Sequence, residues 1–185
     1  QAVMGIEART LRGDGGGMGS ILEITGLLVD VEPSWPDVAY SRASHELLVV
    51  WQRWYDSNHT DHDVMGQRIG LAGGIHTIGP VIPIYNTSND EGNPAVASVP
   101  RFSGVGEYLI ACEYVYGGSA HIAGLLMTDS GTLHDFGWIS PHAGSMPAVA
   151  SNENTREFLV AWRYGSNIQA RTVTTSGAVG PYAQP

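Results

Sequence analysis

A short polar segment at positions 56–63, with the sequence DSNHTDHD, has residue types that bind metal ions. The carboxylate oxygens of Asp61 and Asp63 suit a calcium ion, whereas the imidazole of His62 suits a transition metal. The segment lacks the glycine and the distal glutamate of an EF-hand loop. It therefore predicts either a metal site at Asp61, His62 and Asp63 or a solvated hairpin tip rich in turn-forming residues. We predict no cofactor, with a calcium ion at these residues as the alternative.

Aromatic residues that follow the most apolar segments offer a second kind of chemistry. They are Trp54, Tyr55, Tyr114, Tyr116 and Tyr164. A flat aromatic face with polar groups nearby stacks well on a sugar ring. If these side chains lie at loop tips, they predict a surface that binds a glycan. If they are partly buried, they contribute to packing instead.

No arrangement of residues in the sequence is typical of catalysis. Walker, Rossmann, HExxH and GxSxG motifs are absent, and the seven histidines are scattered along the chain. The segment 128–132, TDSGT, resembles part of the Asp-box of sialidases but lacks its first serine and its tryptophan. We therefore predict no catalytic residues. In the alternative of a hydrolase that draws carboxylates from several repeats, Asp63 and Glu113 are the acids to test.

These candidate residues belong to an internal repeat. Four segments share an apolar first residue and a glycine nine positions later, at 6–15, 65–74, 122–131 and 168–177. Three of them follow a segment that opens on a proline: Pro36, Pro94 or Pro147. The chain is thus predicted to be a single β-repeat domain, 1–185, made of a half unit, 1–35, and three repeats, 36–93, 94–146 and 147–185.

The repeats predict the fold class. Each contains a short run of Val, Leu and Ile bounded by turn residues, at 46–51, 108–112 and 157–162, which indicates a β-strand. Both alternating sets of side chains in LLVVW are apolar, so the sheet must be covered on both faces. With about four short strands in each unit, we predict an all-β chain folded as a β-propeller, with a β-sandwich as the alternative. The repeated arginines, Arg9, Arg68 and Arg171, are expected to serve the fold, for example by pairing with Glu46 or Glu157 across strands or by stacking on a tryptophan.

The repeat resembles units of large bacterial exported and cell-surface proteins, in which P-x-V-A-Y, L-V-V-W and G-x-R segments recur. The resemblance covers nearly the whole chain but rests on structural motifs, so it implies a scaffold outside the cell or on its surface. The second repeat departs from the pattern at Cys112 and Leu125. We expect a noncatalytic extracellular module that binds a glycan or a protein through its loops. The alternatives are a structural self-assembly module and a glycoside hydrolase-like propeller or a fragment of one.

Charge and composition narrow the choice of partners. A formal charge of −9 opposes binding to nucleic acid, and no apolar stretch is long enough to insert into a membrane. The single cysteine, Cys112, stands where two other repeats have tryptophan and is expected to be a buried apolar residue. About three and a half propeller blades would leave open sheet edges. The chain is therefore expected to form a homo-oligomer, such as a homodimer, or to be part of a longer chain.

Overall fold

The computed structural model describes residues 5–11, 17–25, 32–55, 60–100 and 106–182. Positions 56–59 of the polar segment lie outside this range. Within the described ranges the chain forms strands joined by turns, and no helix there is long and apolar enough to cross a membrane. The prediction of an all-β chain is confirmed.

Thirteen strands follow one another along the described part of the chain. Their bounds are β1 (Glu7–Leu11), β2 (Met18–Glu23), β3 (Ser34–Ser41), β4 (Glu46–Trp54), β5 (His62–Gly70), β6 (His76–Tyr85), β7 (Glu91–Pro100), β8 (Gly106–Tyr116), β9 (Ser119–Thr128), β10 (Leu133–Trp138), β11 (Ser145–Asn152), β12 (Glu157–Tyr164) and β13 (Asn167–Thr174).

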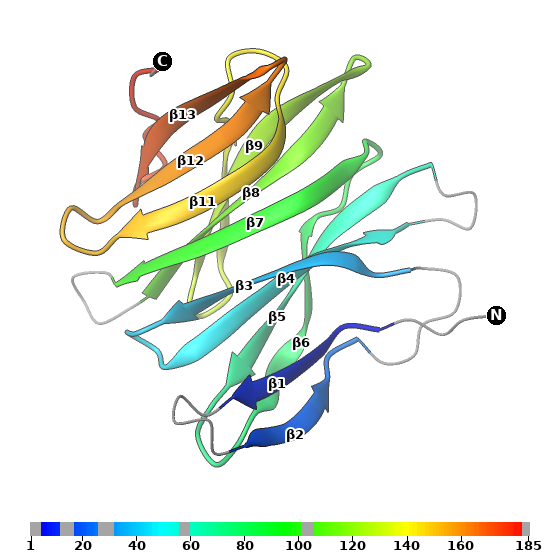
Figure 1. Ribbon diagram of the computed structural model, residues 1–185, viewed down its shortest axis with the longest axis vertical. Coiled ribbons are helices and arrows are strands. Elements are labelled where there is room, and N and C mark those ends of the chain that lie inside the picture. The colour runs from blue at the N-terminus through cyan, green and yellow to red at the C-terminus, as the bar shows by residue number, and fades with distance from the viewer. Residues whose placement is uncertain (1–4, 12–16, 26–31, 56–59, 101–105, 183–185) are drawn as a thin grey trace.

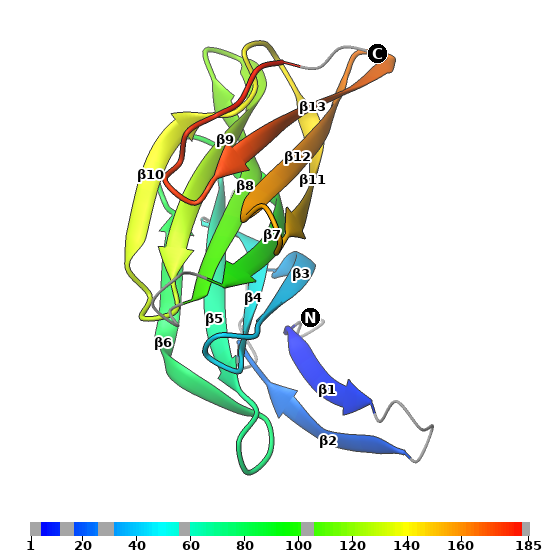
Figure 2. The same ribbon diagram turned by 90° about the vertical axis from the view of Figure 1, so that its left-hand side faces the viewer.

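The strands form four antiparallel sheets in these ranges, and strands that are neighbours in sequence are neighbours in space. β1 and β2 make a hairpin, β3–β6 and β7–β10 make four-stranded sheets, and β11–β13 make a three-stranded sheet. The sheets follow one another along the molecule, with β1 and β2 at one end and β13 at the other (Figure 1, Figure 2). The described strands do not close into a ring or a barrel.

The second strand of a sheet is apolar on both faces, as the LLVVW pattern predicts. Leu48 and Val50 of β4 are fully buried and share a core cluster with Ile110 and Cys112 of β8. Because successive side chains alternate between faces, Val49 points the other way. Burial raises the pKa of the Cys112 thiol well above its usual value. Cys112 therefore serves as the buried apolar residue that the sequence predicts.

Two further clusters of apolar side chains lie between the remaining pairs of neighbouring sheets. Val49 and Trp51, on the second face of β4, share a core cluster with Ile6 and Ile24, which flank the N-terminal hairpin. A third cluster joins β8 to β12 and contains Trp162, which is almost fully buried. Each fully buried side chain of this size contributes about 2 kcal/mol or more to folding. Each of the three core clusters thus joins neighbouring sheets.

The first strands of three sheets, β3, β7 and β11, lie beside one another and begin with the same distortion. The residue before each proline has a positive φ: 53° at Trp35, 47° at Asn93 and 54° at Met146. The strand register shifts at the same place in each sheet. A shift of register with one residue in a left-handed conformation is a β-bulge, which bends the strand at this point.

The arginines of the repeats are not all structurally equivalent. Trp51 pairs with Met65, whereas Trp162 pairs with Gln169, so β5 is offset by one residue from the alignment that the sequence suggests. A one-residue offset places a side chain on the opposite face of the sheet. Arg68 and Arg171 consequently point to different faces.

The two arginines also bind different groups. Arg68 donates from Nε and Nη2 to Oε2 of Glu46, at 3.0 and 2.8 Å. Glu46 is one of the partners that the sequence suggests for these arginines. Arg171 instead donates to backbone carbonyl oxygens, at 2.8 Å to Gly180 and 2.9 Å to Ile139. Ile139 follows β10, so Arg171 ties the last sheet to the segment that leaves the preceding one.

Candidate functional site

The first strand of a sheet starts, and the second strand ends, at the same end of the molecule. The register shows this in three sheets, with the pairs Ser34–Gln52, Glu91–Tyr114 and Ser145–Arg163. We call this the proline end, because the bulged prolines lie there. The arrowheads of β8 and β12 mark it in Figure 1. All five predicted aromatic residues lie at this end, since they occupy or directly follow the ends of β4, β8 and β12.

Two of the predicted residues, Tyr114 and Tyr116, share a cleft with aromatic side chains that the sequence analysis did not select. The cleft has a volume of about 440 Å³. The ring centroid of Trp138 lies 5.3 Å from that of Tyr114 and 6.4 Å from that of Tyr116. Tyr85 packs edge-on to Tyr114 at 5.9 Å. Trp138 is 45% exposed and Tyr116 is 63% exposed, so two rings of this aromatic cleft are open to a ligand.

Polar groups line the same cleft. The hydroxyl of Tyr85 donates to Oδ1 of Asp135 at 3.2 Å, and the backbone N–H of Gly137 donates to the same oxygen at 2.9 Å. Asn89 donates from Nδ2 to the hydroxyl oxygen of Tyr114 at 2.9 Å. Burial, followed by the nearby thiol of Cys112 and carboxylate of Asp135, raises the pKa of Tyr85. Its hydroxyl therefore keeps its proton and remains a donor.

Trp54 lies in a different environment from the open rings of the cleft. Its indole is stacked on the imidazole of His62, with ring centroids 3.4 Å apart and an interplanar angle of 26°. Nδ1 of His62 lies 2.6 Å from Oδ1 of Asp90, which also accepts the backbone N–H of His62 at 3.0 Å. One face of Trp54 is therefore already covered.

Tyr55 and Tyr164 line separate hollows at the proline end. Tyr55 is 60% exposed and borders a hollow of about 560 Å³ together with Asp61, Thr87 and neighbouring loop residues. Tyr164 borders a smaller hollow of about 250 Å³ beside Arg163. Of the five predicted aromatic residues, the structure therefore brings Tyr114 and Tyr116 into one cleft. Trp54, Tyr55 and Tyr164 lie outside that cleft.

The residues predicted to bind a metal are engaged in other contacts. Asp63 is fully buried, and its Oδ2 accepts from Nη2 of Arg53 at 3.4 Å. Burial raises the pKa of Asp63, although the charge of Arg53 opposes the shift. His62 contacts Trp54 and Asp90, as described above. In the part of the chain that the structure describes, no three His, Cys, Asp or Glu side chains are grouped to hold a metal ion.

Glu91 is a buried acid that the sequence analysis did not select. Its side chain is fully buried, its Oε1 accepts from the hydroxyl of Thr87, and its Oε2 accepts the backbone N–H of Thr87 at 3.3 Å. Burial raises the pKa of Glu91 to about 7 against the opposing effect of the Thr87 hydrogen bonds, and the charges of Asp61 and Asp63 raise it further. Near neutral pH this carboxyl is therefore partly protonated.

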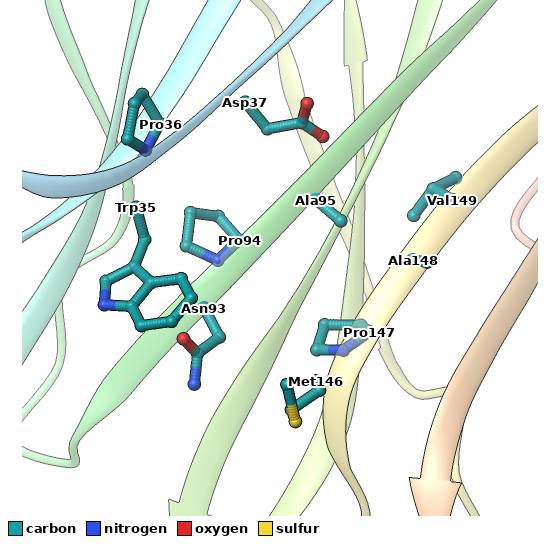
Figure 3. Close-up of a pocket in the computed structure, with 10 residues that line it drawn as sticks. All are labelled: Trp35, Pro36, Asp37, Asn93, Pro94, Ala95, Met146, Pro147, Ala148 and Val149. Atoms are coloured by element: carbon teal, nitrogen blue, oxygen red, sulfur yellow. The ribbon is translucent and has the colours of Figure 1, made fainter. Parts of the chain in front are cut away.

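A central hollow lies between the first strands of three sheets and has a volume of about 590 Å³. Figure 3 shows the prolines of β3, β7 and β11 around it, with the side chains of Trp35, Asn93 and Met146 on one side of these prolines. Trp35 is 62% exposed. Asp37 also lines the hollow, but its Oδ2 accepts the backbone N–H of Val96 at 2.8 Å and so joins β3 to β7.

Carboxylates at the proline end hold the backbone rather than pointing together at one reacting position. Oε1 of Glu113 accepts from Nδ2 of Asn93 at 2.8 Å and from the backbone N–H of Met146 at 2.7 Å. Asp63 is buried beside Arg53, as described above. Glu113 and Asp63 are therefore each engaged in a structural contact. The arrangement suits binding through aromatic faces and hydrogen bonds.

Trp138 and Tyr85 were missed because they end the fourth strands of their sheets. Only aromatic residues that follow the second strand of a repeat were predicted to bind a ligand. A signal was present, since both are aromatic residues at the last position of a strand, β10 or β6. Two adjacent fourth strands end at the proline end, which brings both side chains to the same cleft.

No protein-family model matches this chain, and no curated protein matches it in sequence. Its fold is similar to that of a solved structure, a glycosyl hydrolase from Bacteroides ovatus, with a TM-score of 0.50 and 10% sequence identity. The match covers 80% of this chain and 50% of the hydrolase, so this chain spans about half the length of that protein. At this identity the similarity concerns the fold alone.

Proposed function

We propose that this chain is a noncatalytic module that binds carbohydrate in the aromatic cleft. The observation that carries the proposal is the pair of open rings, Trp138 and Tyr116, beside the carboxylate of Asp135. A sugar presents an apolar face that stacks on an aromatic ring and hydroxyl groups that donate to a carboxylate. The cleft offers both kinds of contact within one volume of about 440 Å³.

The proposal includes a propeller architecture. In this interpretation the four sheets are consecutive blades of a β-propeller, with β3, β7 and β11 as the inner strands around an axis. Support comes from the meander order of each sheet and from the contact of these three first strands. The proline end then corresponds to one face of the propeller, and its loops form the binding surface.

We place the module outside the cell or on its surface, as the resemblance of its repeats to exported proteins implies. The proposal needs no cofactor. Calcium binding at Asp61 and Asp63 stays a prediction, which a calcium titration followed by tryptophan fluorescence can test, because Trp54 is stacked on His62 between these acids.

The test is a glycan array followed by titration calorimetry with the glycans that bind. Trp138→Ala and Tyr116→Ala should each weaken binding at least about tenfold, which corresponds to about 1.4 kcal/mol. Tyr40→Ala is a matched control, because Tyr40 is 42% exposed and lies near the far end of β3, away from the proline end. Binding unaffected by both cleft variants, or no glycan binding at all, would overturn the proposal. A protein ligand would then be the next candidate.

Variants of the other predicted aromatic residues measure how far the surface extends. Tyr55→Ala and Tyr164→Ala should have little effect if the sugar occupies only the aromatic cleft. Weaker binding of long oligosaccharides, with unchanged binding of short ones, would show that the ligand runs along the proline end toward these residues.

A second candidate is a glycoside hydrolase-like propeller or a fragment of one. The similarity in fold to the hydrolase from Bacteroides ovatus favours it, and so does the raised pKa of Glu91, since a general acid must hold its proton near neutral pH. Turnover of an aryl glycoside by the wild type, abolished in Glu91→Gln, would support this candidate. Absence of turnover across a panel of aryl glycosides would leave binding as the function.

A further inference from the structure

Each sheet contacts the next through the same pair of faces. We call the side of a sheet that packs on the following sheet its forward face, and the opposite side its rear face. Leu48 and Val50 are on the forward face of β3–β6 and pack with Ile110 and Cys112 on the rear face of β7–β10. The N-terminal hairpin uses its own forward face, which includes Ile6, against the rear face of β3–β6.

The contact is repeated one sheet later. Leu109 and Ala111, on the forward face of β7–β10, share a core cluster with Val160 and Trp162, on the rear face of β11–β13. Leu48 and Leu109 occupy equivalent positions and are both fully buried. The forward face of the last sheet should therefore be apolar and suited to the same kind of neighbour.

That forward face is open in the described part of the chain. Leu159, at the position of Leu48 and Leu109, is 47% exposed, and Ile168 is 63% exposed. Strand register places Ala161 and Ala170 beside them on the same side of the sheet. The face thus keeps the apolar residues of an intersheet contact while its two large side chains are exposed to solvent.

The rear face of the N-terminal hairpin is also open. Arg9 pairs with Ile21 and Leu11 pairs with Met18, and these side chains lie on the side opposite to Ile6. Ile21 is 53% exposed and Leu11 is 74% exposed. In the last sheet, Val173 occupies the position equivalent to Leu11 and is fully buried. Within the described residues, the first and last sheets therefore expose the two halves of one kind of contact.

Charges at the edges of these faces match as well. Gln52 and Glu113 accept backbone N–H groups of the next sheet, whereas Arg163 stands at the equivalent position of the last sheet and can only donate. The rear face of the hairpin begins with two register-paired carboxylates, Glu7 and Glu23. β1 and β13 occupy equivalent positions in the repeat, and β13 starts at the proline end, where Arg163 also lies. Glu7, at the start of β1, therefore corresponds to that same end.

We propose that a second copy of this chain covers these faces, with the forward face of β11–β13 of each copy packed on the rear face of the β1–β2 hairpin of the other. The two faces differ, so two copies related by a twofold axis make this contact twice and thereby close a ring. The end sheets lie at opposite ends of the long axis of the molecule (Figure 1), as such closure requires. This proposal does not depend on carbohydrate binding.

The test is the absolute mass in solution, by light scattering across a dilution series. The wild type should have twice the mass of one 19.7 kDa chain and should dissociate on dilution. Leu159→Glu and Ile21→Lys should each give a monomer of native circular dichroism, because both side chains are already exposed in the single chain. Tyr116→Glu is the matched control, since Tyr116 is exposed but lies in a middle sheet, and it should keep the doubled mass.

Mixing the two variants distinguishes this contact from other kinds of dimer. In a mixed pair one contact keeps both wild-type faces. The other contact places the carboxylate introduced by Leu159→Glu opposite the ammonium group introduced by Ile21→Lys, so the doubled mass should return. A wild-type monomer at every concentration would overturn the proposal. So would a dimer that both variants leave intact, or a mixture that stays monomeric.

Discussion

The side-chain oxygen Oε1 of Gln52 accepts the backbone N–H of Asn93 at 2.7 Å and joins the end of β4 to the start of β7. Asn93 is one of the three residues with a positive φ before a proline. Glu113 repeats the contact one sheet later, with the backbone N–H of Met146 at 2.7 Å. A polar side chain at the end of β4, and another at the end of β8, thus holds the bulge that opens the next sheet.

Replacing Gln52 should loosen this joint. In Gln52→Leu the N–H of Asn93 loses its acceptor at a partly buried position, so the free energy of unfolding should fall by about 1–3 kcal/mol. Urea denaturation followed by tryptophan fluorescence measures the change. Glu113→Gln is the control, because an amide oxygen can still accept from Met146, and its effect should be smaller. Equal stability of Gln52→Leu and the wild type would contradict this role.

Stability should decrease as pH rises toward 7. The pKa of Glu91 is about 7 in the folded protein and 4.5 for an ordinary glutamate, so the folded state binds the proton more tightly than the unfolded chain. The stability that Glu91 contributes is therefore fully present below about pH 4.5 and is lost as pH rises through 7, by roughly 3 kcal/mol. Burial raises the pKa of Asp63 too and acts in the same direction.

Urea midpoints measured from pH 4.5 to 8 check this dependence. Glu91→Gln keeps a hydrogen-bonding side chain beside Thr87 and should reduce the decrease of stability with pH. Glu153→Gln, a change at an exposed carboxylate beside Arg42, should leave the decrease unchanged. An identical pH profile for Glu91→Gln and the wild type would show that Glu91 is not the titrating group.

Two glycines in central strands should differ in their tolerance of alanine. A Cβ at Gly124 would lie 2.4 Å from Cζ of Phe136 and 2.6 Å from Cδ1 of Ile139, whereas a Cβ at Gly66 would meet Cδ1 of Ile84 at 2.7 Å. The rigid ring of Phe136 cannot move as easily as the end of an isoleucine side chain. Gly124→Ala should therefore destabilise the protein by about 1–3 kcal/mol, and Gly66→Ala by less. Thermal unfolding of the two variants tests the order.

Asp135 should matter for both folding and ligand binding. Asp135→Ala removes the acceptor of Tyr85 and of Gly137, so it should lower the free energy of unfolding by about 1–3 kcal/mol and weaken glycan binding. Asp135→Asn keeps an oxygen for both donors and should retain stability while still weakening binding through the lost charge. Urea denaturation and calorimetry separate the two effects. Unchanged affinity in both variants would exclude Asp135 from the sugar contacts.

The sequence predicts the strands well because each repeat contains a short apolar run bounded by turn residues. It predicts the register of β5 less well. Both faces of these strands are apolar, so the pattern does not specify which residues share a face, and a shift of one residue goes unnoticed at Met65 and Arg68. The structure resolves this through the pairing of Trp51 with Met65.

The candidate site is harder to predict than the fold. Tyr114 and Tyr116 follow a recognisable strand, but Trp138 joins them from β10 and Tyr85 from the preceding sheet. Contacts between sheets depend on how the sheets pack on one another. The alternation of apolar and polar residues along a single strand does not encode this packing. The same limit applies to Glu91, whose raised pKa results from burial beneath residues of other segments.

Cys112 can serve as a natural probe of motion between two sheets, because its thiol is buried between them. Its sulfur lies in the layer between β3–β6 and β7–β10, and the raised pKa keeps it in the unreactive thiol form. A thiol reagent can modify it only when that layer opens. Since the sequence has a single cysteine, the labelling rate under native conditions measures how often these two sheets separate, without any engineered probe.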